Sequence, residues 1–395
     1  MNDLAYLIER CAKLNSEKTA LISNGQLLSF KEVHELSNAL GWGLEELGIK
    51  KSDRVALWVP ICSESVICEF ALLKGGRVKV QINLDLSKEE MMAIINDSSA
   101  NAIIYDSSLR DIKEELKEIF PDLIYIPLHA DNEEISFESL IQQNRKENYS
   151  VHVDNQDLCQ ISYFTDMKGN SKGTIYNVFS KKASLNNNLV DELDITPEDA
   201  ILHVDSFTIE SNNKILPYFI KGAANIFMDT FSVNLFSEYV ERFRVTSTRL
   251  TPMMIEELVQ SDLVEACDFS SLKNIEYNSM EMPVETIKKA VDVFGNIFIK
   301  VISFHDQFFS YLILTKYDHL VGLFELPNIL RSAGREFTFI RTKIVNPHGN
   351  EVPIDVKGEL LISCNNLINS NADEWFSTGE MAKKDERGYV YISDM

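Results

Sequence analysis

The sequence predicts an α/β protein in which two doubly wound, sheet-containing subdomains precede a small β-rich, barrel-like subdomain. Three observations predict this fold class. Strand and helix patterns alternate along residues 1–150, which is typical of a largely parallel sheet covered on both faces. The second subdomain, 151–315, repeats this alternation from Ile161 onward. Residues 316–395 change to short alternating runs separated by glycine-containing turns, which favour a β-rich module.

The first subdomain contains recognisable helix boundaries. Ser29 with Glu32 predicts a capping box, in which each residue's side chain binds the other's backbone N–H at the start of a helix. Gly48 predicts the end of that helix. Ser87 with Glu90 predicts a second capping box. Apolar runs outside these helices predict strands at 55–60, 78–82, 102–105 and 123–126.

The boundaries continue along the rest of the chain. Residues 130–157 are polar and acidic and predict a surface connection between the first two subdomains. Thr251 followed by Pro252 predicts a helix start, with threonine as the N-cap. Tight turns are predicted in the last subdomain at 346–349, 355–358 and 385–388.

Composition restricts the classes of partner. The chain has 60 Asp and Glu against 38 Lys and Arg, a formal net charge of −22. A field of this sign disfavours phosphate backbones and anionic lipid, so no nucleic-acid or membrane partner is expected. Asp3 and Glu9 interrupt the N-terminal apolar residues, unlike a secretory signal, and the six cysteines form no C-x-x-C pair. We therefore expect a cytoplasmic protein; its oligomeric state is not readable, and a homodimer is left open.

Residues 163–173 form a candidate anion-binding loop. Glycines, hydroxyls and lysines follow an apolar, strand-like run that begins at Cys159, and such a loop can present N–H and ammonium groups to phosphate oxygens. The glycine and lysine spacing does not match a Walker A loop. Taken alone, the segment is better explained as an exposed polar turn.

Two further segments contain residues that could carry chemistry. His305 and Asp306 follow an apolar strand pattern and could form an acid–base or metal-adjacent pair, although an isolated His-Asp dipeptide usually does neither. Residues 375–392 read as a β-hairpin with aromatic faces and a glycine turn. Glu380 on this hairpin, considered alone, is explained as a solvated charge.

The order and spacing of these segments resemble the adenylate-forming superfamily of acyl-CoA synthetases, peptide-synthetase adenylation domains and luciferases. The resemblance covers essentially the whole chain, and 375–392 is its most specific stretch. Supporting landmarks are Lys18, Leu28 to Phe30, Gly48, Asp53 to Val55, Arg341, Gly349, Val352-Pro353 and Gly358 to Leu360.

The resemblance implies a reaction and its site residues. Such enzymes use ATP and Mg2+ to convert a small carboxylic acid, acyl or aryl, into an acyl-adenylate, which is then transferred to CoA or a carrier protein. It implies a phosphate-binding role for Thr165, Lys168, Gly169, Lys172 and Gly173. It also implies that Asp306 takes the magnesium-associated position, that His305 lies near the α-phosphate, and that Glu380 accepts hydrogen bonds from the ribose hydroxyls.

The chain also departs from the family pattern. Asp166 stands where the family has a glycine beside the phosphates, and Met167 and Lys168 replace hydroxyl residues. At about 4 Å, a like-charge contact costs from ~1 kcal/mol in water to several when partly buried. His305 and Asp306 replace a threonine and a glutamate, which changes the metal end of the site.

Two hypotheses follow. The chain is either an adenylating domain that is weak or assisted by a partner, or a degenerate, non-catalytic homologue that acts as a binding protein. The family continues into a small C-terminal domain with a catalytic lysine, which this sequence, ending at Met395, does not include; whether the natural protein lacks it or continues beyond residue 395 is left open. Candidate residues for the acid pocket, each of which is also explained as plain core, are His203, Phe207, Tyr277 and Phe304.

Overall fold

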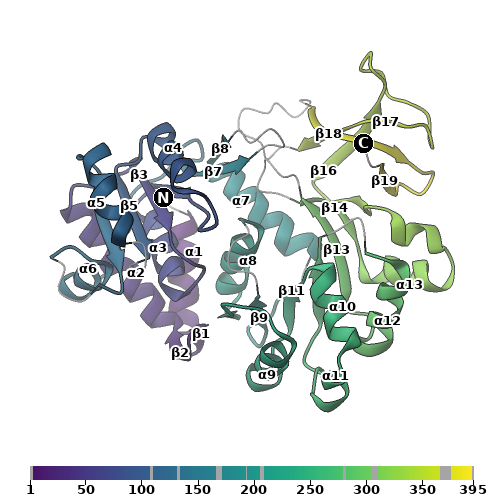
Figure 1. The fold of residues 1–395 in the computed structure, drawn as a ribbon, viewed down its shortest axis with the longest axis horizontal. Helices are drawn as coiled ribbons and strands as arrows, with labels where there is room; N and C mark the ends of the chain where they lie inside the picture. The colour runs from purple at the N-terminus through teal and green to yellow at the C-terminus, as the bar shows by residue number, and fades with distance from the viewer. Residues whose placement is uncertain are drawn as a thin grey trace. The chain divides into compact units, whose positions relative to one another are not determined.

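The computed structural model describes residues 3–106, 110–130, 134–165, 171–192, 194–204, 209–278, 282–303, 310–364 and 375–393. The chain divides into two compact units (Figure 1). Unit 1 comprises Met1–Lys182 and Ser206–Phe227, and unit 2 comprises Ala183–Asp205 and Met228–Met395. The division into three subdomains at 150 and 315 stays a prediction.

Unit 1 contains a six-stranded sheet in the order β6-β5-β3-β4-β7-β8. Its neighbouring strands are parallel except for β8, which is antiparallel to β7. Strand β3 lies between β4 and β5, so the order reverses there, as in doubly wound sheets. The strands are β3 (Arg54–Trp58), β4 (Val78–Gln81), β5 (Ala102–Asp106), β6 (Ile124–Leu128), β7 (Leu158–Thr165) and β8 (Ser171–Asn177).

Two helices of unit 1 begin at the capping boxes that the sequence predicts. Ser29 N donates to Glu32 over 2.7 Å and Glu32 N donates back to Ser29 Oγ over 3.2 Å, which confirms the first capping box. The box at Ser87 and Glu90 is confirmed as well. The helices are α1 (Asp3–Leu14), α2 (Phe30–Glu46), α3 (Ser63–Lys74), α4 (Lys88–Ser98), α5 (Arg110–Ile119), α6 (Phe137–Gln143) and α8 (Ile209–Ile220).

Three more strands lie together in unit 1, in the order β10-β1-β2. Strand β1 (Thr19–Ser23) is antiparallel to β2 (Gln26–Ser29) and parallel to β10 (Ala224–Phe227), which lies far along the chain. Helix α7 (Val178–Asn187), which continues as a π-helix (Asn188–Glu192), leads from unit 1 into unit 2.

Unit 2 contains strands in the order β15-β14-β13-β12-β11-β9. Strands β9, β11, β12 and β13 are parallel, and β14 and β15 are antiparallel additions. The strands are β9 (Ala200–His203), β11 (Ser247–Arg249), β12 (Asn274–Tyr277), β13 (Phe298–Ser303), β14 (Ser310–Leu314) and β15 (Arg335–Glu336). The helices are α9 (Val233–Phe243), α10 (Pro252–Gln260), α11 (Leu263–Ala266), α12 (Val284–Phe294), α13 (Lys316–Phe324) and a 3-10 helix (Pro327–Arg331). Thr251 caps α10, as expected.

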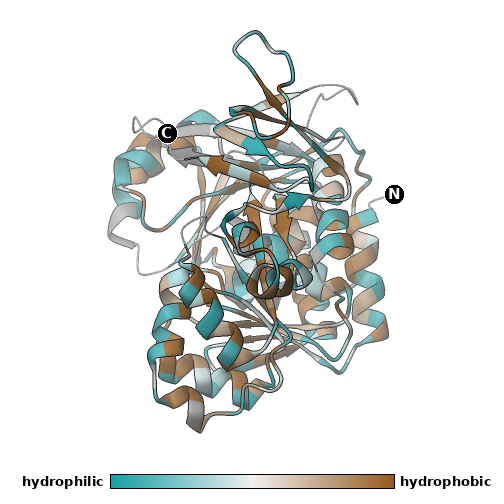
Figure 2. Ribbon diagram, turned by 90° about the vertical axis from the view of Figure 1, so that its right-hand side faces the viewer, coloured by the Kyte–Doolittle hydropathy of each residue, from teal (hydrophilic) through white to brown (hydrophobic). Residues whose placement is uncertain are grey.

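The end of unit 2 is a four-stranded antiparallel sheet in the order β16-β17-β18-β19. Its apolar face packs with residues of β13 and β14 in one hydrophobic cluster that includes Leu360, Ile362 and Tyr311. Figure 2 shows brown, hydrophobic segments along the strands, while the helices alternate between brown and teal. The strands are β16 (Ile340–Val345), β17 (Gly358–Cys364), β18 (Phe376–Lys384) and β19 (Val390–Ser393). The predicted fold class is confirmed.

Candidate functional site

The predicted phosphate loop, residues 163–173, includes the end of β7 and the start of β8, which form a hairpin. Strands β7 and β8 pair antiparallel, with Tyr163 opposite Gly173 and Thr165 opposite Ser171. Lys172 lies in β8, opposite Phe164. Lys168 and Gly169, with the rest of 166–170, lie outside the described residues.

Two residues of this hairpin contact each other directly. A Cβ on Gly173 would lie 3.0 Å from Cε1 of Tyr163, so the tyrosine ring covers the position where a side chain would project. The Tyr163 hydroxyl donates to Asp97 Oδ2 over 2.6 Å, which fixes the ring from its other end. The glycine at 173 is therefore explained by close packing within the hairpin.

The predicted metal end follows β13. This strand ends at Ser303, whose hydroxyl lies 3.2 Å from that of Ser310 at the start of β14. Phe304, His305 and Asp306 fall between these strands and lie outside the described residues. Among the residues that the structure does describe, no group of three or more His, Cys, Asp or Glu side chains could hold a metal ion.

Glu380 lies on β18, within an irregular stretch of that strand. Pairing steps from Glu359–Met381 to Leu361–Ser377, so the residues from Thr378 to Glu380 bulge out of the ladder. Gly379 has φ +75°, a left-handed conformation that favours glycine.

Two hydrogen bonds fix the backbone at Glu380. Its N–H donates to Thr378 Oγ1 over 3.1 Å, and that hydroxyl donates to Leu360 O over 2.9 Å. The Glu380 carboxylate then accepts a hydrogen bond of 2.7 Å from Tyr311 Oη. Glu380, predicted from sequence as an acceptor, is thus held at both its backbone and its side chain.

Two tyrosines of the predicted 375–392 hairpin, Tyr389 and Tyr391, donate hydrogen bonds to carboxylates. Tyr389 Oη donates to Asp318 Oδ1 over 2.6 Å, and Tyr391 Oη donates to Asp385 over 3.2 Å. Arg335 adds a hydrogen bond to Asp318 over 3.0 Å. In the structure, this part of the stretch secures the position of β19.

Two of the four candidate pocket residues lie at strand ends. His203 and Tyr277 are the last residues of β9 and β12, and both are buried. Phe207, like Phe304, lies outside the described residues. The pocket-lining role of all four stays a prediction.

Tyr277 belongs to a buried hydrogen-bonded chain with His319. His319 Nδ1 lies 2.8 Å from Thr315 O, so it carries the proton, and Nε2 accepts from the Tyr277 hydroxyl over 2.9 Å. Burial lowers the pKa of His319 to about 4, which keeps the ring neutral near pH 7. No spacing pattern pointed to His319, because its partner lies on a distant strand.

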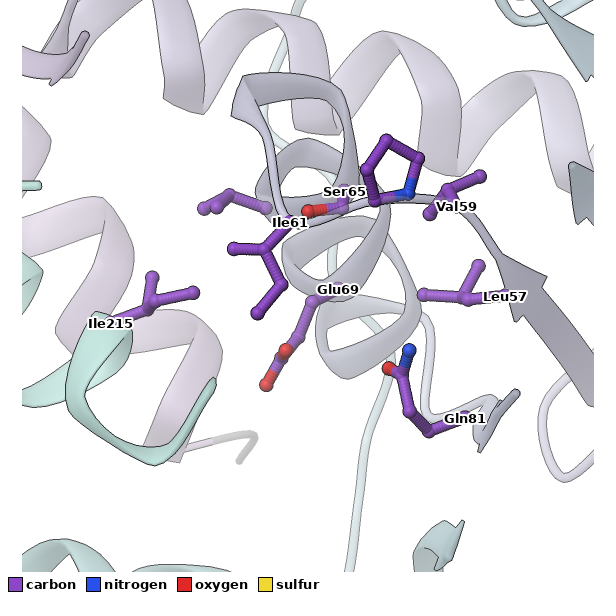
Figure 3. Close-up of a pocket in the computed structure, with 9 residues that line it drawn as sticks. Leu57, Val59, Ile61, Ser65, Glu69, Gln81 and Ile215 are labelled. Carbon is purple, nitrogen blue, oxygen red and sulfur yellow. The ribbon is translucent and has the colours of Figure 1, made fainter. Parts of the chain in front are cut away.

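A separate hollow lies in unit 1, where the order of its sheet reverses. Residues following β3 and the last residue of β4, Gln81, line it, at the carboxyl ends where such sheets bind ligands. Figure 3 shows Glu69 and Gln81 pointing into the same space, with Ile215 of α8 on the other side. Its volume of about 10 Å³ suits one water molecule.

Two buried lysines bind the carboxylate of Glu69. Lys79 and Lys181 donate to its two carboxylate oxygens over 2.7 and 2.9 Å. Burial alone would raise the pKa of Glu69, but Lys181 and Lys79 outweigh it and lower that pKa to about 2. The two lysines therefore keep Glu69 ionised, and the small volume of the hollow indicates that these residues stabilise the fold.

Membrane association was not expected from the sequence. No helix within the described ranges is long and apolar enough to cross a membrane.

Known proteins resemble the chain over nearly its whole length. A fatty acid–[acyl-carrier-protein] ligase of Streptomyces coeruleorubidus is 21% identical over 391 residues, which cover 95% of this chain and 73% of the relative. A feruloyl-CoA synthase of Amycolatopsis is 23% identical, with 98% and 77% covered. The crystal structure of an anthranilate CoA ligase in complex with anthranoyl-AMP superposes with a TM-score of 0.88 at 20% identity, covering 98% of this chain and 77% of that one. Residues 8–370 match the family of AMP-binding enzymes, and the chain therefore belongs to this family.

Proposed function

We propose that the protein activates a carboxylic acid with ATP and Mg2+ to an acyl-adenylate and transfers the acyl group to a thiol, on CoA or a carrier protein. The observation that carries this proposal is the family match over residues 8–370. The similar proteins named above are ligases that join fatty, ferulic or anthranilic acid to such a thiol.

The reaction proceeds in two balanced steps. The carboxylate oxygen of the acid attacks the α-phosphorus of ATP, and pyrophosphate leaves with the electron pair of the broken P–O bond. The thiolate of the acceptor then attacks the acyl carbon, and AMP leaves. Both substrates of the first step are anions, so the site has to supply cations and hydrogen-bond donors.

The proposed roles follow from this requirement. Thr165, Lys168, Gly169, Lys172 and Gly173 of the β7–β8 hairpin would hold the phosphates. Glu380 would accept hydrogen bonds from the ribose hydroxyls.

The metal end and the acid pocket complete the assignment. Asp306 would hold Mg2+, which offsets phosphate charge when bound, and His305 would lie at the α-phosphate. His203, Phe207, Tyr277 and Phe304 would line the acid pocket.

A non-catalytic role is the second candidate. Asp166, Met167 and His305 all differ from the family pattern at the phosphate end, while Glu380 keeps a carboxylate at the ribose end. Such a chain would bind AMP or adenosine without turning over ATP, and would act as a binding protein.

The test combines chemistry and binding. Hydroxamate trapping and pyrophosphate exchange with a panel of aryl and acyl acids measure the first step, and calorimetry measures binding of AMP and Mg-ATP. We expect exchange with at least one acid, lost in Lys172→Ala. AMP binding without exchange for any acid would favour the second candidate, and no binding of either nucleotide at millimolar concentration would refute both.

A further inference from the structure

Tyr311 and Glu380 both occupy irregular positions in their strands. Between β13 and β14, Ile302 pairs with Leu312 and Ser303 with Ser310, which leaves Tyr311 as the extra residue of a bulge. Glu380 lies in the bulge of β18 described above. Bulges turn a side chain away from the regular pleat, and they are frequent next to active sites. Here two bulges on different sheets bring a hydroxyl and a carboxylate to 2.7 Å.

The tyrosine is held more firmly than the glutamate. Tyr311 is 1% exposed and belongs to the cluster that joins β13 and β14 to the four-stranded sheet. Its backbone oxygen accepts from Phe337 N over 3.2 Å. Glu380 is only half-buried. In this pair the tyrosine is the fixed partner, and the more exposed carboxylate takes its position from it.

The direction of the hydrogen bond is settled by the charges. Burial, and after it the negative charge of Glu380, raises the pKa of Tyr311 above its ordinary value of 10. The hydroxyl therefore keeps its proton at neutral pH and donates to the carboxylate. A hydrogen bond to a charged acceptor is among the stronger ones in proteins.

We propose that Tyr311 is a positioning residue, whose hydroxyl holds the Glu380 carboxylate in the orientation that receives the nucleotide's ribose hydroxyls. This inference rests on the proposed function, in which Glu380 is the ribose acceptor. It adds a residue that does not touch the nucleotide and that acts only through Glu380.

The chain offers a matched control. Tyr389 also donates its hydroxyl to a carboxylate, that of Asp318, over 2.6 Å, and it is 6% exposed. Tyr389→Phe therefore removes the same kind of bond in the same unit without changing the partner of Glu380. Any general loss of stability should appear in both Tyr→Phe variants.

The experiment compares AMP with 2′,3′-dideoxy-AMP, which lacks the ribose hydroxyls, by calorimetry. We expect Tyr311→Phe to weaken AMP binding by about tenfold while leaving dideoxy-AMP binding unchanged. Tyr389→Phe should keep the preference for AMP. Glu380→Ala should abolish this preference, and Tyr311→Phe should have no further effect in that background.

The outcomes separate the two proposals. If the unmodified protein binds AMP but Tyr311→Phe retains the full preference over dideoxy-AMP, the positioning role is wrong and the proposed function stands. Equal weakening of both ligands would also refute it, since that indicates a generally loosened site. If the unmodified protein binds no nucleotide at all, the proposed function fails, and the role of Tyr311 fails with it.

Discussion

The hydroxyl of Tyr389 donates to the carboxylate of Asp318 over 2.6 Å and joins the start of β19 to the first turn of α13. Asp318 is fully buried. It also accepts from Thr315 N, Thr315 Oγ1 and Arg335 Nη2 over 2.8, 2.7 and 3.0 Å. One carboxylate therefore serves as helix cap, ion-pair partner and anchor of the last sheet.

Replacing this carboxylate should destabilise the protein. In Asp318→Asn, a single amide oxygen cannot serve all of these donors, and buried donors left without acceptors cost about 1–3 kcal/mol each. We expect the free energy of unfolding to fall by about 2–4 kcal/mol, measured by urea denaturation. Asp355→Asn is the control, because the Lys383–Asp355 pair is exposed and should contribute less than about 1 kcal/mol. Equal effects of the two variants would contradict this assignment.

A second prediction concerns Gly173 in the β7–β8 hairpin. In Gly173→Ala the new methyl would lie 3.0 Å from the Tyr163 ring, and the hydrogen bond to Asp97 opposes movement of that ring. We expect a loss of about 1–2 kcal/mol in the free energy of unfolding.

The Tyr163→Leu background provides the control for this variant. Removing the ring removes the close contact, so Gly173→Ala should then be neutral or slightly stabilising, by about 0.4–1 kcal/mol at most. Thermal and urea unfolding of the four proteins give the coupling between the two positions. Additive effects would mean that the ring is not the cause.

Local signals made much of the fold predictable. The capping pairs at Ser29 and Ser87 depend on residues three positions apart, and both were confirmed. The pairing of strands that are distant in the chain could not be predicted from the sequence. Strand β10 joins β1 across some two hundred residues of chain, and no local pattern encodes such a neighbour.

The residues of the candidate site also differ in whether the sequence could predict them. Glu380 could be found because it lies in a motif with recognisable neighbours. Tyr311 could not, because it stands in the apolar run of β14, where a tyrosine reads as core, and its acceptor is 69 positions away. A hydrogen bond between residues far apart in the chain produces no local pattern in the sequence.

The buried cluster of Glu69 with Lys79 and Lys181 leads to a third prediction. Glu69→Gln removes the carboxylate that pairs with the buried ammonium groups of Lys79 and Lys181, which should cost about 3–5 kcal/mol at pH 7. The exposed pair Lys31–Glu35 is the control, and Glu35→Gln should change stability by less than about 1 kcal/mol.

The pH dependence of this effect has a definite sign. The pKa of Glu69 is lowered from 4.5 to about 2, so its stabilising contribution is fully present above pH 4.5 and is lost as the pH falls toward 2. The difference in unfolding free energy between wild type and Glu69→Gln should therefore shrink between pH 4.5 and 2. A difference that stays constant over this range would show that Glu69 is not held ionised by the lysines.

Lys74 gives a pH dependence of the same sign at higher pH. This fully buried side chain donates to Ser37 Oγ and Asn38 Oδ1, both over 2.7 Å, and lies 3.1 Å from His34 Nδ1. Burial lowers the pKa of Lys74 from 10.5 to about 7, and Glu9 offsets only a small part. Between pH 7 and 10.5 the unfolded chain therefore binds more protons at this position than the folded one, so the contribution of Lys74 to stability increases with pH.

Lys74→Met removes this titration. Both proteins are unfolded with urea from pH 6 to 10. Above pH 7, the free energy of unfolding of the wild type should rise relative to that of the variant by up to about 1.4 kcal/mol per pH unit. Lys300, whose pKa burial lowers to about 8, titrates in the same window, but it is present in both proteins and cancels in the difference. A constant difference across this range would mean that Lys74 stays charged in the folded protein, held by its hydrogen-bond acceptors against the cost of burial.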